Sequence, residues 1–225
     1  MRRLSFFLIV LSLFAAGVSA QYLGQMSPAS ILEANTGKAG AYFSTGDEAF
    51  AVVGSARYAF GNYTEGRFRL GLIDEDGSNT DPHIIVGIDG KYSLWKYGGS
   101  AGTGSSGTYN NPLDLALGFG FEFAQLEWST DLGLGGSVIG SIPYHFRNNT
   151  SIEPYARLNL RYERIDYDSR VFPDRPRLDD YSESNFEVGL NVGALFSVTP
   201  LVDFTAEFQL DNQLAFLFGV DFAAF

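Results

Sequence analysis

The chain of 225 residues is 45% hydrophobic and 15% aromatic, carries a formal net charge of −11 and contains no cysteine. The acidic balance argues against nucleic acid as a partner, and the lack of cysteine excludes disulfides, thiol chemistry and cysteine-based zinc sites. After residue 20 no apolar run reaches the roughly 18 residues that a transmembrane helix needs. A hydrophobic content this high therefore predicts alternating strands in a single all-β domain.

The first twenty residues have the pattern of a secretion signal. Two arginines are followed by an apolar run at 4–18 and by the small-x-small sequence Val18-Ser19-Ala20. This pattern predicts a signal peptide, residues 1–20, that is cleaved after Ala20. A retained membrane anchor is the alternative, but the run is short for a span and no cysteine follows it to take a lipid.

Residues 21–36 lack alternation and are expected to form an N-terminal arm or a short helix at the mouth of a barrel. From residue 37 to residue 225, apolar and polar side chains alternate, which places them on opposite faces of β-strands. Phe186 and Val188, for example, flank Glu187. Ten strands are predicted, at 37–45, 48–60, 63–73, 83–96, 112–124, 126–146, 150–165, 184–198, 201–210 and 213–225.

The sixth predicted strand is long because its apolar phase runs unbroken from Leu126 to Phe146. A two-residue hairpin inside it would reverse that phase. One strand with a bulge near Gly135-Gly136 or Gly140 is therefore favoured. A hairpin at those glycines is the alternative, and it would change the strand count.

The two faces of these strands differ in a way that favours a membrane barrel over a soluble, lipocalin-like one. The apolar face carries large side chains in every strand but the first, so it is expected to meet lipid. The polar face mixes charges with glycine, as at Gly87, Gly193 and Gly219, which suits a crowded lumen better than a convex, water-exposed surface. Aromatic residues near strand ends, including Phe60 and Tyr144, are expected to form interfacial girdles.

The pattern over residues 37–225 resembles small bacterial outer-membrane β-barrel proteins of the outer-membrane protein A or W type, with a porin-like architecture. The last strand carries Phe222 and ends at Phe225, which resembles the family's C-terminal assembly signal, although Ala223 stands where an aromatic residue is usual. The resemblance implies a monomeric, antiparallel up-and-down transmembrane β-barrel in the outer membrane. It also implies outer-membrane lipid and the barrel-assembly machinery as partners.

Such barrels place both termini and the short turns in the periplasm and the longer loops outside. Counting strands back from the C-terminus puts the connections at 74–81 and 166–183 outside, where 166–183 is the best candidate for contact with extracellular ligands. The same count puts the Gly- and Ser-rich connection at 98–111 in the periplasm, against the usual length rule. If the sixth predicted strand were split by a hairpin, the connection at 98–111 would lie outside and the one at 74–81 would lie in the periplasm.

The inward positions carry more acids than bases. They predict either a cation-favouring pore lining or a salt-bridged plug that fills a narrow barrel. The plug is favoured, because buried charges must pair and ten strands enclose little space. Two arginines of the seventh predicted strand are expected to pair with carboxylates on neighbouring strands. The expected lumen charge network comprises Arg57, Arg67, Arg69, Lys91, Asp131, Arg157, Arg161, Glu163, Glu187, Asp203 and Glu207.

Signals for chemistry are weak. Ser141 and His145 share a predicted face, as a lipid hydrolase or acyltransferase would need, but four residues along a strand keep them apart. The acidic turn at 74–81 lacks the spacing of a calcium loop, and no phosphate-binding glycine loop is present. We expect no enzyme activity, cofactor or metal, and a structural role or a narrow passage for small solutes. The alternatives are an outer-membrane lipid-modifying enzyme and a soluble periplasmic barrel that binds a hydrophobic ligand.

Overall fold

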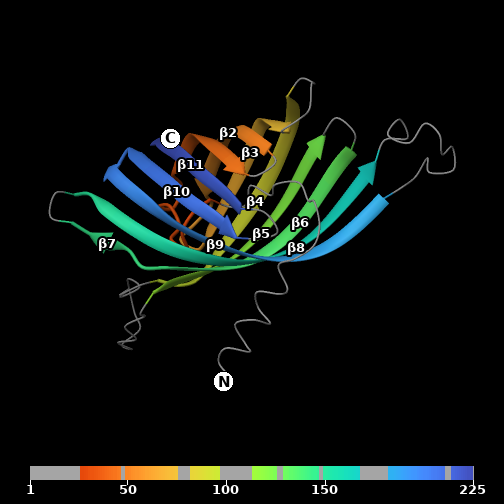
Figure 1. The fold of residues 1–225 in the computed structure, drawn as a ribbon. Coiled ribbons are helices and arrows are strands. Elements are labelled where there is room, and N and C mark those ends of the chain that lie inside the picture. The colour runs from red at the N-terminus through yellow and green to blue at the C-terminus, as the bar shows by residue number, and fades with distance from the viewer. Residues whose placement is uncertain are drawn as a thin grey trace, which may run out of the picture.

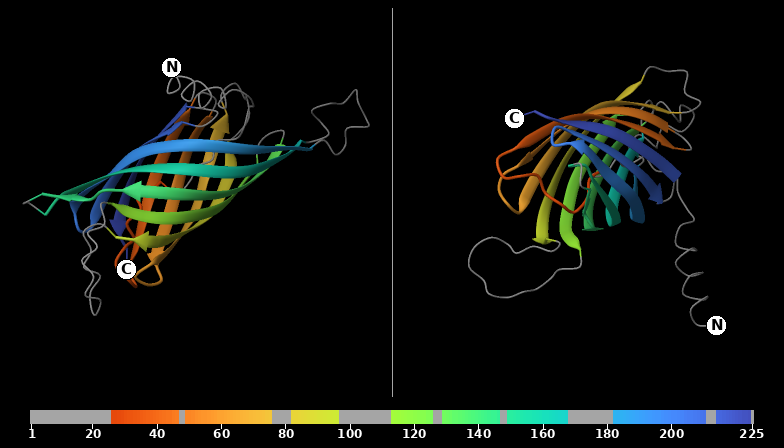
Figure 2. Two further views of the ribbon diagram at one scale, coloured as in Figure 1. Left: turned by 90° about the horizontal axis from the view of Figure 1, so that it is seen from below. Right: turned by 90° about the vertical axis from the view of Figure 1, so that its left-hand side faces the viewer.

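The computed structural model describes residues 26–46, 49–75, 82–96, 113–125, 129–146, 149–167, 182–210 and 214–224. The strands among them form one antiparallel sheet (Figures 1 and 2). The predicted signal peptide, the 98–111 connection, most of 166–183 and Phe225 lie outside these residues. The strands are β1 (Gly37–Gly46), β2 (Ala49–Ala59), β3 (Thr64–Glu75), β4 (His83–Trp95), β5 (Asp114–Gln125), β6 (Ser129–Ser141), β7 (Tyr144–His145), β8 (Ser151–Tyr167), β9 (Ser182–Thr199), β10 (Val202–Leu210) and β11 (Leu214–Ala223).

The sheet closes into an up-and-down barrel of ten strands. Neighbours in sequence are neighbours in the sheet, and β1 pairs with β11 to close the ring. The two-residue β7 continues β6 and pairs with β8 in the same register. The predicted all-β, antiparallel transmembrane barrel is confirmed.

Over its described residues 129–146 the sixth predicted strand contains no hairpin, as expected, but the expected bulge is wrong. Gly135, Gly136 and Gly140 pair with β5 and β8 without any shift of register. The strand is interrupted at Ile142 and Pro143 instead, because proline has no N–H to donate to a ladder. The Ile142 N–H still donates to Pro154 O at 3.1 Å, which keeps the register across the break.

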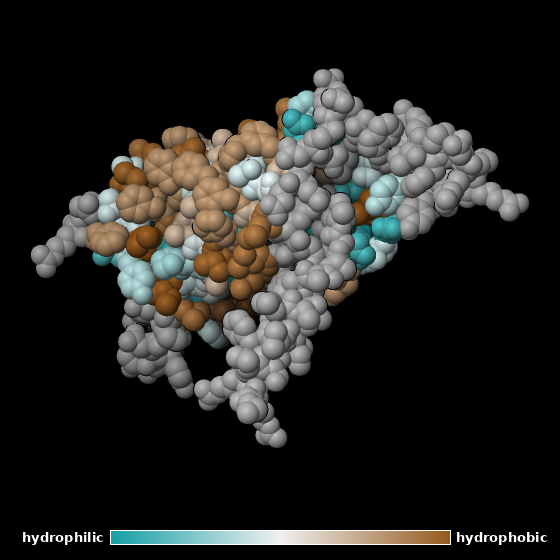
Figure 3. Space-filling model, viewed as in Figure 1, coloured by the Kyte–Doolittle hydropathy of each residue, from teal (hydrophilic) through white to brown (hydrophobic). Residues whose placement is uncertain are grey.

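The barrel is polar inside and apolar outside. On β9, Val192 is 46% exposed and Asn191 is 1% exposed, and on β10 Phe204 is 36% exposed and Asp203 is 3% exposed. Figure 3 shows apolar side chains covering much of the visible outer face. A soluble barrel would bury the apolar face, so this surface contradicts the soluble alternative and is that of a barrel surrounded by lipid. No helix among the described residues is long and apolar enough to cross a membrane.

Inward glycines make room for long side chains from neighbouring strands. A Cβ on Gly87 would lie 2.6 Å from Arg69 Nη2, and one on Gly193 would lie 2.6 Å from Tyr155 Oη. A Cβ on Gly219 would overlap the ring of Tyr42. The expected crowded lumen is confirmed at these positions.

Candidate functional site

The lumen holds part of the chain itself. Residues 26–36, here called the N-terminal segment, form no helix and run inside the barrel before β1 begins. Met26, Ser27 and Ala29 are at most 2% exposed. Asn35 adopts a positive φ of 62° and donates its N–H to Ala59 O at 2.9 Å, which turns the segment into β1. We call the end of the barrel with Gly37 and Ala223 the termini end, and the opposite end the far end.

Lys91 on β4 is the main cationic contact of the N-terminal segment. Its Nζ donates to Ser30 O at 2.6 Å, to Pro28 O at 2.9 Å and to Ser27 Oγ at 3.3 Å. The same Nζ lies 3.4 Å from Glu65 Oε1 on β3. Since a lysine ammonium has three donors, the segment alone can satisfy them.

Two carboxylates hold the backbone N–H groups of the segment. Glu153 on β8 accepts from Ser30 Oγ at 2.7 Å and from Ser30 N at 3.4 Å, and Glu65 accepts from Leu32 N at 3.1 Å. Ser141 accepts from Ala29 N at 3.1 Å and donates to Glu153 at 2.6 Å. The segment is therefore bound through donors and acceptors on four strands, β3, β4, β6 and β8.

Ser141 is thus part of the wall that holds the segment. His145, its expected catalytic partner, is exposed at the termini end. The described contacts do not bring the two side chains together. No group of three or more His, Asp or Glu side chains within the described ranges is arranged to hold a metal ion.

An ion-pair cluster near the termini end joins strands on both sides of the barrel closure. Arg57 Nη2 lies 3.2 Å from Asp203 and 3.1 Å from Asp221. Lys38 Nζ lies 2.5 Å from Asp203, and Tyr42 Oη donates to Asp221 at 2.7 Å. These contacts tie β1 and β2 to β10 and β11, so they fasten the seam where the chain closes on itself.

A second cluster lies around Glu207 on β10, which is 0% exposed. Arg157 Nη2, Tyr155 Oη and Asn191 Nδ2 each donate to it at 2.6 Å. Arg157 thus reaches from β8 past β9 to β10. Arg161, four residues further along β8 and on the same face, pairs with Glu187 on the adjoining β9.

All the residues expected in the lumen charge network lie buried, at 0% to 7% exposure. Arg69 on β3 also forms ion pairs in the lumen, with Asp89 at 2.9 Å and with Glu122 at 3.0 Å. Arg67 donates to Met26 O at 3.5 Å, and its guanidinium lies 5.5 Å from the centre of the Tyr42 ring. Of the expected C-terminal signal, Phe222 is 52% exposed on the outer face.

The sequence reasoning missed the two tyrosines that reach into the lumen. Tyr42 occupies a polar-face position of β1 between Ala41 and Phe43, so its parity could have identified it. Tyr155 has the same inward parity as Glu153 and Arg157 on β8. The N-terminal segment could not have been placed in the lumen from its own pattern, because it has none.

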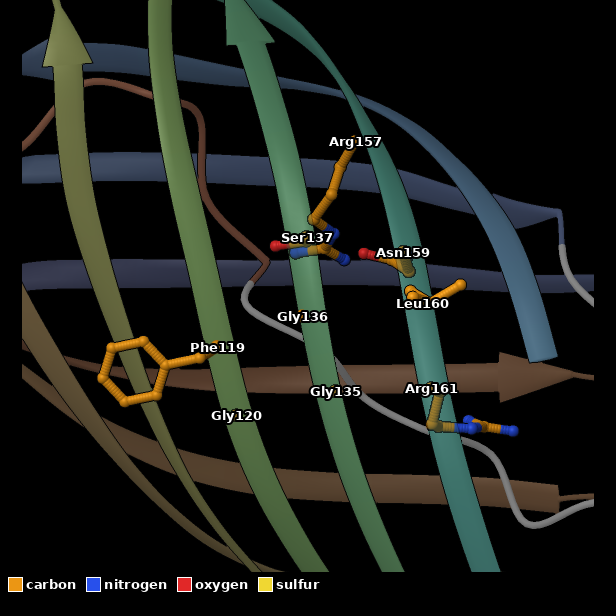
Figure 4. A pocket seen from close by; sticks show the side chains of 9 residues that line it. All are labelled: Phe119, Gly120, Gly135, Gly136, Ser137, Arg157, Asn159, Leu160 and Arg161. Atoms are coloured by element: carbon orange, nitrogen blue, oxygen red, sulfur yellow. The ribbon is translucent and has the colours of Figure 1, made fainter. Parts of the chain in front are cut away.

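The space beside the β8 arginines Arg157 and Arg161 is small. A cavity of about 10 Å³ lies at Gly120, Gly135 and Gly136. Figure 4 shows Arg157 and Arg161 on β8 beside it, with Phe119 on the other side. Such a volume is at the lower limit for one water molecule. This part of the lumen is narrow, and its lining residues Gly135, Ser137 and Asn159 remain partly exposed.

No protein-family model matches the sequence, and no curated protein matches it. Among solved structures, the N-terminal β-barrel domain of Pseudomonas aeruginosa OprF is 12% identical, with 86% of this chain and 100% of that chain covered and a TM-score of 0.38. The KdgM porin in complex with disordered oligogalacturonate is 10% identical, with 84% and 99% covered and a TM-score of 0.41. Ail, the attachment invasion locus protein of Yersinia pestis, is 12% identical, with 85% and 98% covered and a TM-score of 0.36.

Proposed function

We propose that this chain is a non-enzymatic outer-membrane β-barrel whose lumen is a narrow passage for small solutes, closed by its own N-terminal segment. The lipid-facing surface and the predicted secretion signal support the outer membrane as its location. In the closed state the barrel has a structural role. The passage opens when the segment leaves the lumen.

The observation that carries this proposal is the binding of the segment by Lys91, Glu65 and Glu153. The segment contributes backbone and hydroxyl groups and no charge to these contacts. A typical hydrogen bond contributes a net ~0.5–1.5 kcal/mol, because water can replace either partner. Water entering the lumen can therefore displace the segment one contact at a time. The groups that it uncovers are polar and charged, which suits ions and small polar solutes.

A reversible cross-link tests this proposal. The chain contains no cysteine, and Ala29 N lies 3.1 Å from Ser141 Oγ, so the A29C/S141C variant places two thiols where the segment meets the wall. We expect discrete openings of the refolded protein in a planar bilayer under reducing conditions, and none after oxidation. The A29C single variant is the control, because it cannot form the cross-link. Its openings should be the same under reducing and oxidising conditions.

Loosening the segment should have the opposite effect. We expect Lys91→Met to increase the open fraction, because it removes the donor to three oxygens of the segment. Lys38→Met is the matched control, since Lys38 pairs with Asp203 and has no described contact with the segment. If oxidation leaves the conductance of the A29C/S141C variant unchanged, the segment is not the plug. A complete lack of openings in Lys91→Met would leave the barrel as a structural element without a passage.

A further inference from the structure

A hollow lies on the outer face of the barrel where two glycines replace the usual large apolar side chains. Gly66 on β3 and Gly90 on β4 are direct cross-strand partners and have outward parity, because their neighbours Glu65, Arg67 and Lys91 point into the lumen. The cavity over them measures about 610 Å³. The side chains that surround it on the outer face are Tyr58, Phe60, Phe68, Ile88, Tyr92 and Phe119.

Two phenylalanine rings lie against these glycines. A Cβ on Gly66 would lie 2.8 Å from the ring of Phe60, and a Cβ on Gly90 would overlap the ring of Phe119. Both rings remain exposed, at 68% and 66%. The glycines thus let the rings form the floor and sides of an open groove. Its volume lies within the range of about 300–1,000 Å³ found for small-molecule sites, and its lining suits an alkyl chain.

A positive charge lies beyond the groove in the direction of the termini end, separated from it by two tyrosine rings. Tyr92 lines the groove, and its ring centre lies 6.5 Å from that of Tyr63. Lys96 Nζ lies 5.9 Å from the Tyr63 ring centre. Lysine beside aromatic rings at the end of a membrane strand is placed where lipid headgroups lie. In a chain of net charge −11, this cation complements the phosphate of an anionic lipid.

We propose that this groove binds one acyl chain of an anionic phospholipid, whose phosphate lies beside Lys96. The site faces the bilayer and is separate from the lumen, so it does not depend on whether the passage conducts. The lipid is recognised by two features, the apolar hollow over the glycines and the cation beyond the tyrosines at its end.

Native mass spectrometry of the refolded full chain in detergent tests the site, with phosphatidylglycerol and phosphatidylcholine as probes. Gly66→Leu fills the hollow, and we expect it to weaken phosphatidylglycerol binding about tenfold, as expected for lost contact with roughly two methylene groups. Gly54→Leu is the matched control, because Gly54 is an outward glycine on β2 with space for a Cβ and no place in the groove. Ile88→Trp fills the same hollow from an exposed position and replaces Gly66→Leu if that variant does not fold.

Lys96→Gln should remove the preference for phosphatidylglycerol over phosphatidylcholine while the acyl chain still binds. Equal binding by Gly66→Leu, Ile88→Trp and Gly54→Leu would overturn the groove as the site. Equal binding of the two lipids by the unsubstituted protein would overturn the role of Lys96.

Discussion

Replacing Arg157 by methionine should destabilise the barrel strongly. Arg157 is 1% exposed, and its only described ion-pair partner is Glu207, which is 0% exposed. Methionine keeps much of the side-chain volume but leaves the carboxylate with the neutral donors Tyr155 and Asn191. Breaking a buried pair on one side typically costs ~3–5 kcal/mol, because the remaining charge stays desolvated without a counterion. We expect a loss in that range.

Urea unfolding in lipid vesicles, followed by tryptophan fluorescence and heat-modifiable migration, gives the free energy of unfolding. The R157M/E207Q double variant should be more stable than R157M alone, because glutamine removes the buried charge. Arg164→Met is the matched control on the same strand. Arg164 pairs with Asp166 at 3.0 Å but both are about half exposed, so its loss should cost at most ~1 kcal/mol. Equal effects of R157M and R164M, or strictly additive effects in the double variant, would refute the reasoning.

Three further predictions concern the wall and its orientation. Val192→Arg on the lipid face should cost ~2–4 kcal/mol in the same unfolding assay if it lies near mid-membrane, and a neutral result would contradict the face assignment. Gly219→Ala should cost ~1–3 kcal/mol, because a Cβ overlaps the tyrosine ring beside it, and unchanged stability would show that the lumen can relax there. The connections after β3 and β8 leave the far end and the connection after β4 leaves the termini end. Single cysteines at Asp76 and Asp179 should therefore react with an impermeant maleimide on intact cells, and a cysteine at Ser105 should not. Reaction at Ser105 but not at Asp76 would reject this orientation.

The alternation of the sequence was sufficient to predict the architecture, because each strand has one face in lipid and one in the lumen. In the sixth predicted strand, the unbroken apolar phase correctly predicts that no hairpin divides the described residues 129–146. The expected bulge is absent at Gly135-Gly136 and at Gly140, because a glycine permits an irregular backbone but does not require one. The strand is instead interrupted next to Pro143, which has no N–H to donate.

The partners within the lumen could not be predicted in the same way, because parity gives a face and not a contact. Tyr155, Gly193 and Glu207 lie in one row across β8, β9 and β10. The glycine in the middle lets the tyrosine pass over β9 and reach the glutamate. Sequence alone does not show which side chains are long enough, and which neighbours are small enough, for such a contact.

The N-terminal segment helps to hold a buried acid of the wall, Glu153. Glu153 is buried and is held by the neutral donors of Ser30 and Ser141, so the closed segment replaces the water that this carboxylate would otherwise need. Glu153→Gln should loosen the segment, because an amide has one oxygen to accept where the carboxylate has two. Lys91→Met should loosen it as well. The two variants nevertheless differ in the charge that remains in the opened passage.

Reversal potentials in a potassium chloride gradient should separate them. Glu153→Gln removes a negative charge and should lower the selectivity for cations, whereas Lys91→Met removes a positive charge and should raise it. If both variants open the passage but shift the reversal potential in the same direction, these side chains do not line the path of the ions. The segment would then close a different route through the barrel.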